Sequence, residues 1–291
     1  DLHLAATGSA ALVLDPKRRP AVAPGPRQPE LVREIVLGDK WRPRRSLENS
    51  LVLDRCEWRF ADTKWSAPMP VFVAQKQIRE QMGLRDISHP SIPQPWARYA
   101  EPSAVRPRAV ELRFTFRAEK LPKSGLDLVM ESSELFHIAL NGRLIENRPK
   151  GWWLEKSMDR IALANLRRGE NTLVLRCDYR DAPEYELEEC YLIGDFAVDR
   201  DTDAIVREPE TLAPGDWCDQ GHPYYAGNLS YGRDVTLRLR KGEQAIVSVG
   251  PHFGACIAVH VNGQLAGVRG WPPYEVDITR SVKAGRNHIE V

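Results

Sequence analysis

The chain has 291 residues, about twice the size of a common domain, which favours two domains or one large sandwich. Hydrophobic residues make up 42% and charged residues 28%, an ordinary globular composition that excludes wholesale disorder. Lysine and arginine total 41 and aspartate and glutamate total 40, so the net charge is +1. We therefore expect no nucleic-acid partner and, without an apolar run of roughly 18 residues, no membrane partner.

Residues 1–30 are expected to be the trailing strand and linker of a preceding domain. They contain one strand-like run, Ala10–Leu14, followed by the proline-rich segment Pro16–Pro29. The chain begins without Met and without the basic and apolar layout of a secretory signal. It stops inside the strand-like Asn287–Val291. We expect both ends to be cut from a longer polypeptide, which would truncate the second domain at its C-terminus.

Short apolar runs between closely spaced glycines and prolines predict a first β-sandwich over residues 31–203. Glu111–Arg117 alternates polar and apolar residues, the pattern of a half-buried antiparallel strand. One helix is predicted over Val71–Met82, with Pro70 before it and Gly83 after it. Ser88–Pro95 is predicted to be an ordered loop. The expected strands are Arg33–Leu37, Leu51–Trp58, Ala109–Phe116, Leu126–Met130, Phe136–Leu140, Arg160–Leu163, Thr172–Cys177 and Cys190–Val198.

The charged turn Asp199–Asp203 is expected to precede a second β-sandwich over residues 204–291. Its expected strands are Val235–Leu239, Gln244–Val249, Cys256–Val261, Tyr274–Ile278 and Asn287–Val291. The fold class predicted for the whole chain is all-β, with two tandem antiparallel β-sandwiches of jelly-roll type and one decorating helix.

The five cysteines are widely spread, odd in number and without a C-x-x-C pair. This pattern indicates neither a dense disulfide framework nor a structural zinc motif. We expect most of them to be buried small hydrophobic residues. They are Cys56, Cys177, Cys190, Cys218 and Cys256.

The sequence contains an internal repeat. The first copy has Asn141-Gly142 after one strand and Gly169-Glu170-Asn171 before another, and the second has Asn262-Gly263 and Gly285-Arg286-Asn287 in the same order. Asn-Gly favours a type I′ hairpin turn because both residues tolerate positive φ. Gly-x-Asn before an apolar run favours a second tight turn. Two copies of this skeleton predict two sandwiches of related design.

The second copy, Val259–Val291, resembles the galactose-binding-like β-sandwich through Val-x-Val-Asn-Gly, Asp-Ile-Thr and Gly-x-Asn-x-Ile-x-Val. This jelly roll occurs in the sugar-binding domain of glycoside hydrolase family 2 and in accessory domains of family 106 α-L-rhamnosidase-like proteins. The first copy, which closes with Glu188–Val198, resembles the inter-domain sandwiches of those large bacterial enzymes, as does Asn49–Asp54. The resemblance covers residues 31–291. It implies a non-catalytic accessory region of a parent glycoside hydrolase whose catalytic barrel lies outside this chain.

Few residues suggest catalysis or metal binding. A glycosidase needs two carboxyl groups about 5–5.5 Å or 6.5–9.5 Å apart. Glu186 and Glu188 would share a face on a strand, but a charged loop is the favoured interpretation. Cys218 and His222 are four residues apart, yet a polar loop is favoured over a zinc or calcium site. We expect no catalytic residue, no metal ligand and no cofactor, although a structural calcium ion remains an alternative.

Sugar binding would use tryptophan and tyrosine rings, on which the apolar C–H face of a pyranose stacks, with polar groups beside them. The preferred site is Trp217, Tyr224 and Tyr225, with Asp219 and His222 for hydroxyl contacts. Asp216 and Gln220 are further polar neighbours. Trp152-Trp153 and Trp271 with Tyr274 are the other aromatic groups. The family resemblance implies that Trp153, Trp271 and Tyr274 plug the end of the sandwich or lie in an interface.

The favoured hypothesis is an accessory region that packs on or shapes the catalytic domain of the same parent chain. An independent carbohydrate-binding module is the alternative, and a stand-alone structural or adhesion protein is the third hypothesis. The expected partners are carbohydrate and the parent's catalytic domain. The compartment stays open, since parents of this kind are often exported but no signal is present.

Overall fold

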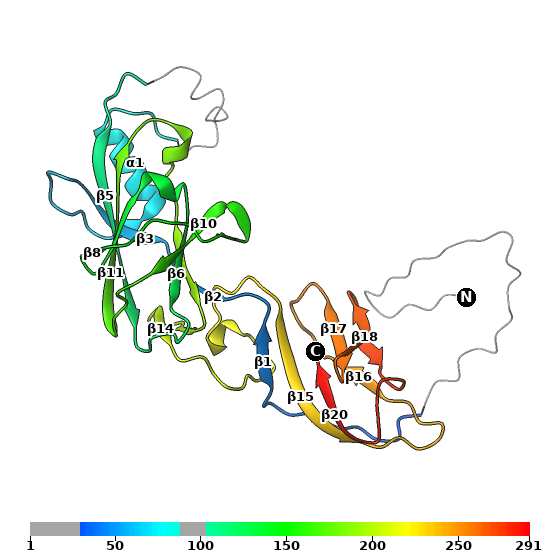
Figure 1. The fold of residues 1–291 in the computed structure, drawn as a ribbon. Coiled ribbons are helices and arrows are strands. Elements are labelled where there is room, and N and C mark those ends of the chain that lie inside the picture. Colours follow the sequence, from blue (N-terminus) through cyan, green and yellow to red (C-terminus); the bar gives the residue numbers. More distant parts are fainter. Residues whose placement is uncertain (1–29, 88–102) are drawn as a thin grey trace, which may run out of the picture. The chain divides into compact units, whose positions relative to one another are not determined.

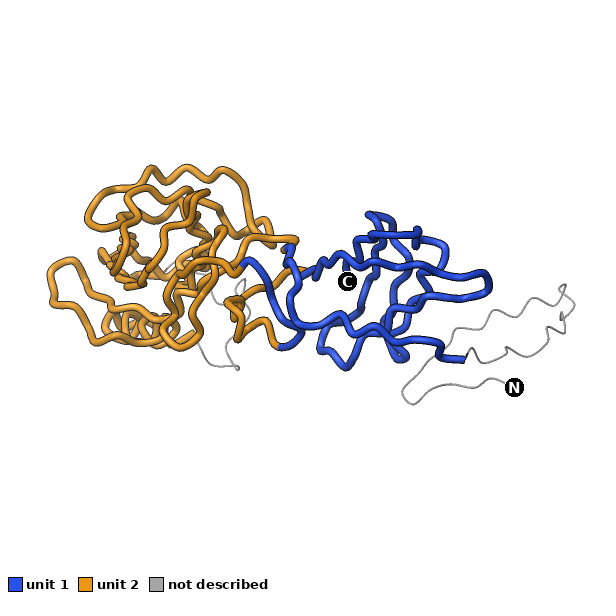
Figure 2. The backbone as a smooth tube through the Cα atoms, turned by 90° about the horizontal axis from the view of Figure 1, so that it is seen from below, with its two compact units in different colours: residues 1–44, 210–215, 229–291 blue, residues 45–209, 216–228 orange. Residues whose placement is uncertain are grey.

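The computed structural model describes residues 30–87 and 103–291, which are coloured in Figure 1. This part of the chain forms two compact units (Figure 2). Of the described residues, the larger unit contains 45–87, 103–209 and 216–228, and the smaller contains 30–44, 210–215 and 229–291. Both units consist mainly of antiparallel β-sheet, which confirms the all-β prediction. The predicted linker over residues 1–29 and the predicted loop Ser88–Pro95 lie outside the described residues.

Two sheets build the larger unit. One has the strand order β13-β14-β5-β11-β7-β8, with β3 paired to β5 and β4 paired to β3, and the other has the order β2-β12-β6-β10-β9. The strands of the first sheet are β3 (Arg55–Phe60), β4 (Met69–Pro70), β5 (Arg108–Ala118), β7 (His137–Leu140), β8 (Arg143–Leu144), β11 (Gly169–Tyr179), β13 (Ala197–Asp199) and β14 (Ala204–Val206). Those of the second are β2 (Asn49–Leu53), β6 (Leu126–Glu131), β9 (Trp152–Trp153), β10 (Glu155–Leu163) and β12 (Cys190–Gly194).

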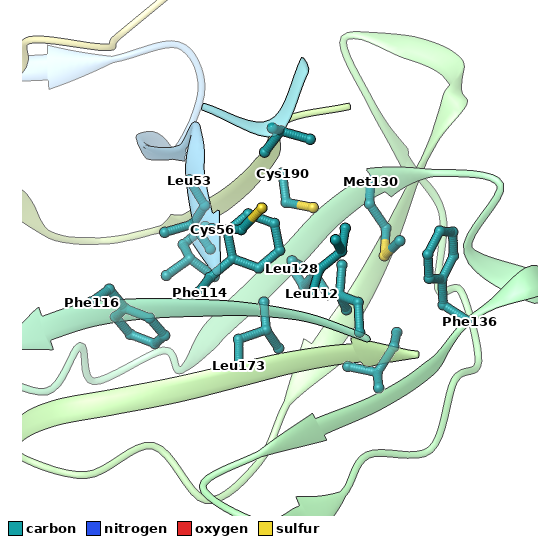
Figure 3. Packing of buried hydrophobic residues seen from close by; sticks show 14 of the residues in the cluster. Leu53, Cys56, Leu112, Phe114, Phe116, Leu128, Met130, Phe136, Leu173 and Cys190 are labelled. Atoms are coloured by element: carbon teal, nitrogen blue, oxygen red, sulfur yellow. The ribbon is translucent and has the colours of Figure 1, made fainter. Parts of the chain in front are cut away.

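The core of the larger unit lies between these sheets. Phe114 of β5, Leu173 of β11 and Leu128 of β6 are fully buried in one hydrophobic cluster. Figure 3 shows their side chains turned toward one another. Burial of one such side chain contributes about 1.5–3 kcal/mol, so this cluster is the main stabilising element of the unit.

Helix α1 (Val71–Gln81) confirms the predicted helix, with Pro70 before it and Met82 after it. Its apolar residues Val71, Ala74 and Ile78 are buried, as their helical spacing predicts. The buried face also includes Arg79, which is 2% exposed. Its guanidinium group donates hydrogen bonds to the Arg85 carbonyl at 2.7 Å, the Tyr179 hydroxyl at 3.3 Å and the Asp181 carboxylate at 2.7 Å.

The smaller unit has a five-stranded sheet of order β1-β15-β20-β17-β18 and a two-stranded sheet, β16-β19. The first contains β1 (Arg42–Arg45), β15 (Leu229–Leu237), β17 (Ile257–Val261), β18 (Gln264–Arg269) and β20 (Gly285–Glu290). The second contains β16 (Ile246–Ser248) and β19 (Glu275–Asp277). Val259, Val261, Val276 and Ile278 are buried between them, and Leu37 packs against this cluster.

The division into units differs from the predicted boundary between residues 203 and 204. The charged turn that suggested this boundary joins β13 to β14 inside the larger unit. Asp199 Oδ1 accepts hydrogen bonds from the backbone of Thr202 at 3.0 Å and from its hydroxyl at 2.7 Å. Beyond the turn, Ile205 is fully buried in the larger core. The polar turn is therefore a hairpin inside one unit. Its composition alone does not indicate which core the following strand joins.

One strand expectation needs correction, whereas the expectation that most cysteines are buried is confirmed. Arg33–Leu37 forms no strand, and Val36 is 85% exposed, whereas β1 begins later, at Arg42. Among the cysteines, Cys256 is exposed and Cys218 is half-buried. Cys56, Cys177 and Cys190 are buried as expected, and burial raises the pKa of the Cys56 and Cys177 thiols to about 12.

Candidate functional site

Both units contain the same arrangement of six strands within the described residues. Four strands follow the order β5-β11-β7-β8 in the larger unit and β15-β20-β17-β18 in the smaller. The other two, β6 with β10 and β16 with β19, pair antiparallel in a second sheet. Leu173 lies opposite Leu140, and Ile289 lies opposite Val261. The repeat predicted from the sequence therefore occupies matching topological places, and we call this arrangement the six-strand module.

Each module has an Asn corner, made by Asn141 with Asn171 in one copy and by Asn262 with Asn287 in the other. Asn141 and Asn262 begin the hairpin turns with φ of 54° and 53°, and the following glycines have φ of 78° and 82°. The side-chain amide of the first asparagine donates to the side-chain oxygen of the second at 2.9 Å in both copies.

The second asparagine of each corner is fully buried and bonded to the turn before it. Asn171 accepts from the Arg167 backbone N–H at 2.9 Å, and Asn287 accepts from that of Lys283 at the same distance. Their amide groups donate to the carbonyl oxygens of the same two residues at 2.8 Å. Buried polar groups require such partners, so the Gly-x-Asn motif serves the tertiary structure as well as the turn.

The preferred sugar-binding segment, residues 216–228, packs into the larger unit. Trp217 is half-buried, and its ring lies edge-on to that of Tyr225, with centroids 6.1 Å apart. Tyr225 is buried; its hydroxyl accepts from the Ser46 backbone at 2.9 Å and donates to the Asn228 carbonyl at 2.7 Å. The fully buried His222 lies beside Tyr225. The structure thus brings these three rings together through internal packing.

The two remaining residues of the predicted site have protein partners of their own. The Tyr224 hydroxyl donates to Asp203 at 2.7 Å, and burial together with this bond raises the pKa of Tyr224 to about 12. The exposed Asp219 carboxylate pairs with Arg200.

Sequence reasoning missed the acid–base group beneath this segment. Arg45 Nε donates to Glu208 Oε1 at 2.7 Å, and His222 Nε2 lies 3.8 Å from the same oxygen, beyond hydrogen-bonding distance. Burial of Glu208 opposes ionisation, but His222 and Arg45 outweigh it and lower the pKa of Glu208 to about 2. Glu208 therefore stays ionised and pairs with Arg45, close to the buried His222 of the segment.

The acidic stretch that precedes β12 is irregular. A short 3₁₀ helix, η2 (Pro183–Tyr185), leads into it, and Glu186 and Glu188 line a pocket of about 20 Å³ together with Leu112 and Phe136. Burial raises the pKa of Glu188, and the negative charges of Glu131, Glu186 and Glu189 raise it further. Pockets that bind small molecules have volumes of roughly 300–1,000 Å³, so this one does not accommodate a sugar ring.

No three His, Cys, Asp or Glu side chains in the described ranges are grouped to hold a metal ion. Cys218 Sγ lies 3.9 Å from the Pro223 carbonyl oxygen. No helix of residues 30–87 or 103–291 is both long and apolar enough to cross a membrane.

The other two aromatic groups divide into buried and exposed rings. Trp153 is buried against Tyr191, with ring centroids 5.6 Å apart, and Tyr274 packs against the smaller core. Trp152 and Trp271 are 54% and 51% exposed. The interpretation as sandwich plugs therefore fits Trp153 and Tyr274, but it is wrong for Trp271.

No family model matches the chain, and no curated protein matches it. Solved structures similar to it include a GH2 beta-galacturonidase from Eisenbergiella tayi, with 10% identity over 85% of this chain and 36% of that chain and a TM-score of 0.30. A rhamnosidase from Novosphingobium sp. PP1Y has 15% identity over 65% and 20%, with a TM-score of 0.24. The Streptomyces avermitilis alpha-L-rhamnosidase has 12% identity over 88% and 25%, with a TM-score of 0.32.

These named neighbours are glycoside hydrolases, and the chain spans between a fifth and about a third of their length. At TM-scores of 0.32 and below, no residue role passes from them to this chain.

Proposed function

We propose that the chain is a non-catalytic accessory β-sandwich region of a bacterial glycoside hydrolase, which packs on or shapes the catalytic domain of the same parent chain. The observation that supports this is the six-strand module, present twice with the same register and the same Asn corner. This module is built by the residues through which the sequence resembles the accessory sandwiches of such enzymes.

The experiment compares the native gene product with a version that lacks residues 30–291. We expect the complete product to hydrolyse aryl glycosides and the deletion variant to lose soluble, active enzyme, because its catalytic domain would expose the surface that the accessory region covers. The isolated chain is assayed in parallel and is expected to show no turnover. Turnover by the isolated chain that disappears in Glu186→Gln or Glu188→Gln would contradict the proposal.

The second candidate function is carbohydrate binding, as an independent module. It is favoured by the two half-exposed tryptophans, Trp152 and Trp271, because exposed indole rings can stack on the apolar face of a sugar. Calorimetry of the chain with a panel of oligosaccharides tests it. Binding that survives Trp217→Ala would count against the site first expected from the sequence.

A further inference from the structure

The six-strand module carries an exposed tryptophan on the same connection in both units. In the larger unit the chain between β8 and β10 contains Gly151-Trp152, and in the smaller the chain between β18 and β19 contains Gly270-Trp271. The exposed fractions, 54% and 51%, are nearly equal. The cores of the two units differ in size, yet each unit leaves one tryptophan of this connection half-exposed.

Exposure of an indole ring has a stability cost. A tryptophan side chain can bury up to roughly 250 Å², so half exposure forgoes about 100 Å² of apolar burial. The adjacent Trp153 shows that this connection can bury an indole, since it is only 5% exposed. A hydrophobic core is therefore within reach of this connection, yet the Trp152 ring stays half-exposed.

Backbone hydrogen bonds order the chain at Trp152 and three residues beyond Trp271. In the larger unit Arg160 N donates to the Gly151 carbonyl at 2.9 Å, and Trp152 lies opposite Asp159 across the β9–β10 pair. In the smaller unit Val249 N donates to the Tyr274 carbonyl at 2.9 Å, three residues after Trp271. A ring presented on a fixed backbone loses little conformational entropy when a ligand stacks on it.

Polar groups accompany each ring. Asp159 is half-buried opposite Trp152, and its carboxylate accepts from the Ser133 hydroxyl at 2.6 Å. Arg269 and Glu275 are exposed on either side of Trp271 in sequence. A pyranose ring has an apolar C–H face that fits an indole and hydroxyl groups that need hydrogen-bonding partners, so a flat aromatic ring with polar neighbours suits it.

We propose that Trp152 and Trp271 are paired sugar-stacking platforms, one in each module, and that each binds a pyranose ring of a glycan. This inference deepens the proposed function and rests on its carbohydrate-binding part. It moves the expected site away from Trp217, whose ring is edge-on to Tyr225 within the larger unit.

The test uses native electrophoresis of the whole chain in gels that contain arabinoxylan, mixed-linkage β-glucan, galactan or polygalacturonate. We expect at least one polysaccharide to retard the chain. Trp152→Ala and Trp271→Ala should each lower the association constant about tenfold, and the double variant should abolish retardation. Phe72→Ala is the matched control, because Phe72 is an exposed aromatic residue of α1, 58% exposed and outside the module.

A second measurement covers the case in which a variant folds poorly. The chain is labelled with 5-fluorotryptophan, and the ¹⁹F signals of Trp152 and Trp271 are assigned with Trp→Phe variants. Addition of oligosaccharides from the retarding polymer should shift these two signals and leave that of the buried Trp153 unchanged. Shifts confined to the two exposed residues would support the proposal.

Several results would overturn the inference. One is the absence of retardation by all four polymers, and another is an equally large drop of the association constant in Phe72→Ala. The others are ¹⁹F shifts confined to Trp217 and tryptophan-dependent self-association without sugar binding. Each leaves the accessory role untouched, because that role is tested separately by hydrolysis in the native gene product.

Discussion

The two units use one six-strand module with very different amounts of core around it. The cluster of the larger unit contains 33 buried hydrophobic residues and that of the smaller contains nine, counted over the described part of the chain. The contrast extends to single positions. Phe114 lies opposite Leu173 and is fully buried, whereas the equivalent residue opposite Ile289 is Arg233, whose guanidinium group lies 5.9 Å from the Trp41 ring centroid.

The Asn corner is nevertheless the same in both units to within 0.1 Å in its principal hydrogen bonds, which are 2.9 Å between the asparagines in each copy. Its geometry therefore does not depend on the size of the core. We conclude that local hydrogen bonding specifies the module, and the core sets how much stability each copy has in reserve.

The largest expected difference concerns the core. Leu173→Ala should destabilise the larger unit by about 4 kcal/mol, and Ile289→Ala should destabilise the smaller by about 2–3 kcal/mol. Leu173 is surrounded by large buried side chains that cannot close the cavity, whereas Ile289 faces a smaller and more adaptable core. Hydrogen exchange followed by mass spectrometry reports each unit separately during urea titration. Equal losses would show that the cores are equally rigid.

Removal of the Asn corner should lower the free energy of unfolding of both units by a similar amount but should unfold only the smaller unit. Asn171→Ala and Asn287→Ala each leave a partly buried backbone N–H and carbonyl without their side-chain partner, which costs about 2–3 kcal/mol. The smaller unit has less reserve, so we expect global exchange of its amides in Asn287→Ala. In Asn171→Ala the larger unit should retain slow exchange. Unfolding of the larger unit alone would refute this ranking.

Acid should lower the free energy of unfolding of the larger unit more than that of the smaller unit, by about 1–2 kcal/mol. The pKa of Glu208 is lowered to about 2 in the folded state, so its stabilisation is complete above pH 4.5 and is lost as the pH falls toward 2. In the smaller unit Arg286, His288 and Arg42 lower the pKa of Asp234, which has the same sign. Asp234 is at the surface, so 0.5 M salt should screen its effect but not that of Glu208.

Thermal unfolding of Glu208→Gln and Asp234→Asn between pH 2 and 6, at low and high salt, measures these terms. The Glu208→Gln variant should lose its excess acid sensitivity at both salt concentrations. An acid response of the larger unit that is unchanged in this variant would show that Glu208 is not its source.

The smallest expected effect is at the hairpin turns. Gly142→Ala and Gly263→Ala should each cost about 1 kcal/mol, because both glycines have positive φ and an added Cβ meets no atom within 4 Å. The strain is then purely conformational and should be equal in the two units. Melting curves of the paired variants measure it, and a difference above about 1 kcal/mol would show that the turns are not equivalent.

Much of this fold could be predicted where the decisive interactions are local. The Asn-Gly and Gly-x-Asn motifs predicted the turns of both corners. Alternation of polar and apolar residues predicted β5, and the helical spacing of apolar residues after Pro70 predicted α1. The candidate site was harder to predict. A tryptophan in a loop has the same sequence signature whether its ring is buried like that of Trp153 or half-exposed like that of Trp152.

The sequence by itself determined the all-β class, the internal repeat and the turn residues, because φ preferences and residue periodicity act within a few positions of the chain. Only the tertiary structure decided that residues 216–228 belong to the larger unit, that Asn171 and Asn287 are fully buried, and which indole rings remain exposed. These features depend on contacts between residues far apart in the chain, such as Arg45 with Glu208. Burial is a property of the packed molecule, and no short stretch of residues encodes it.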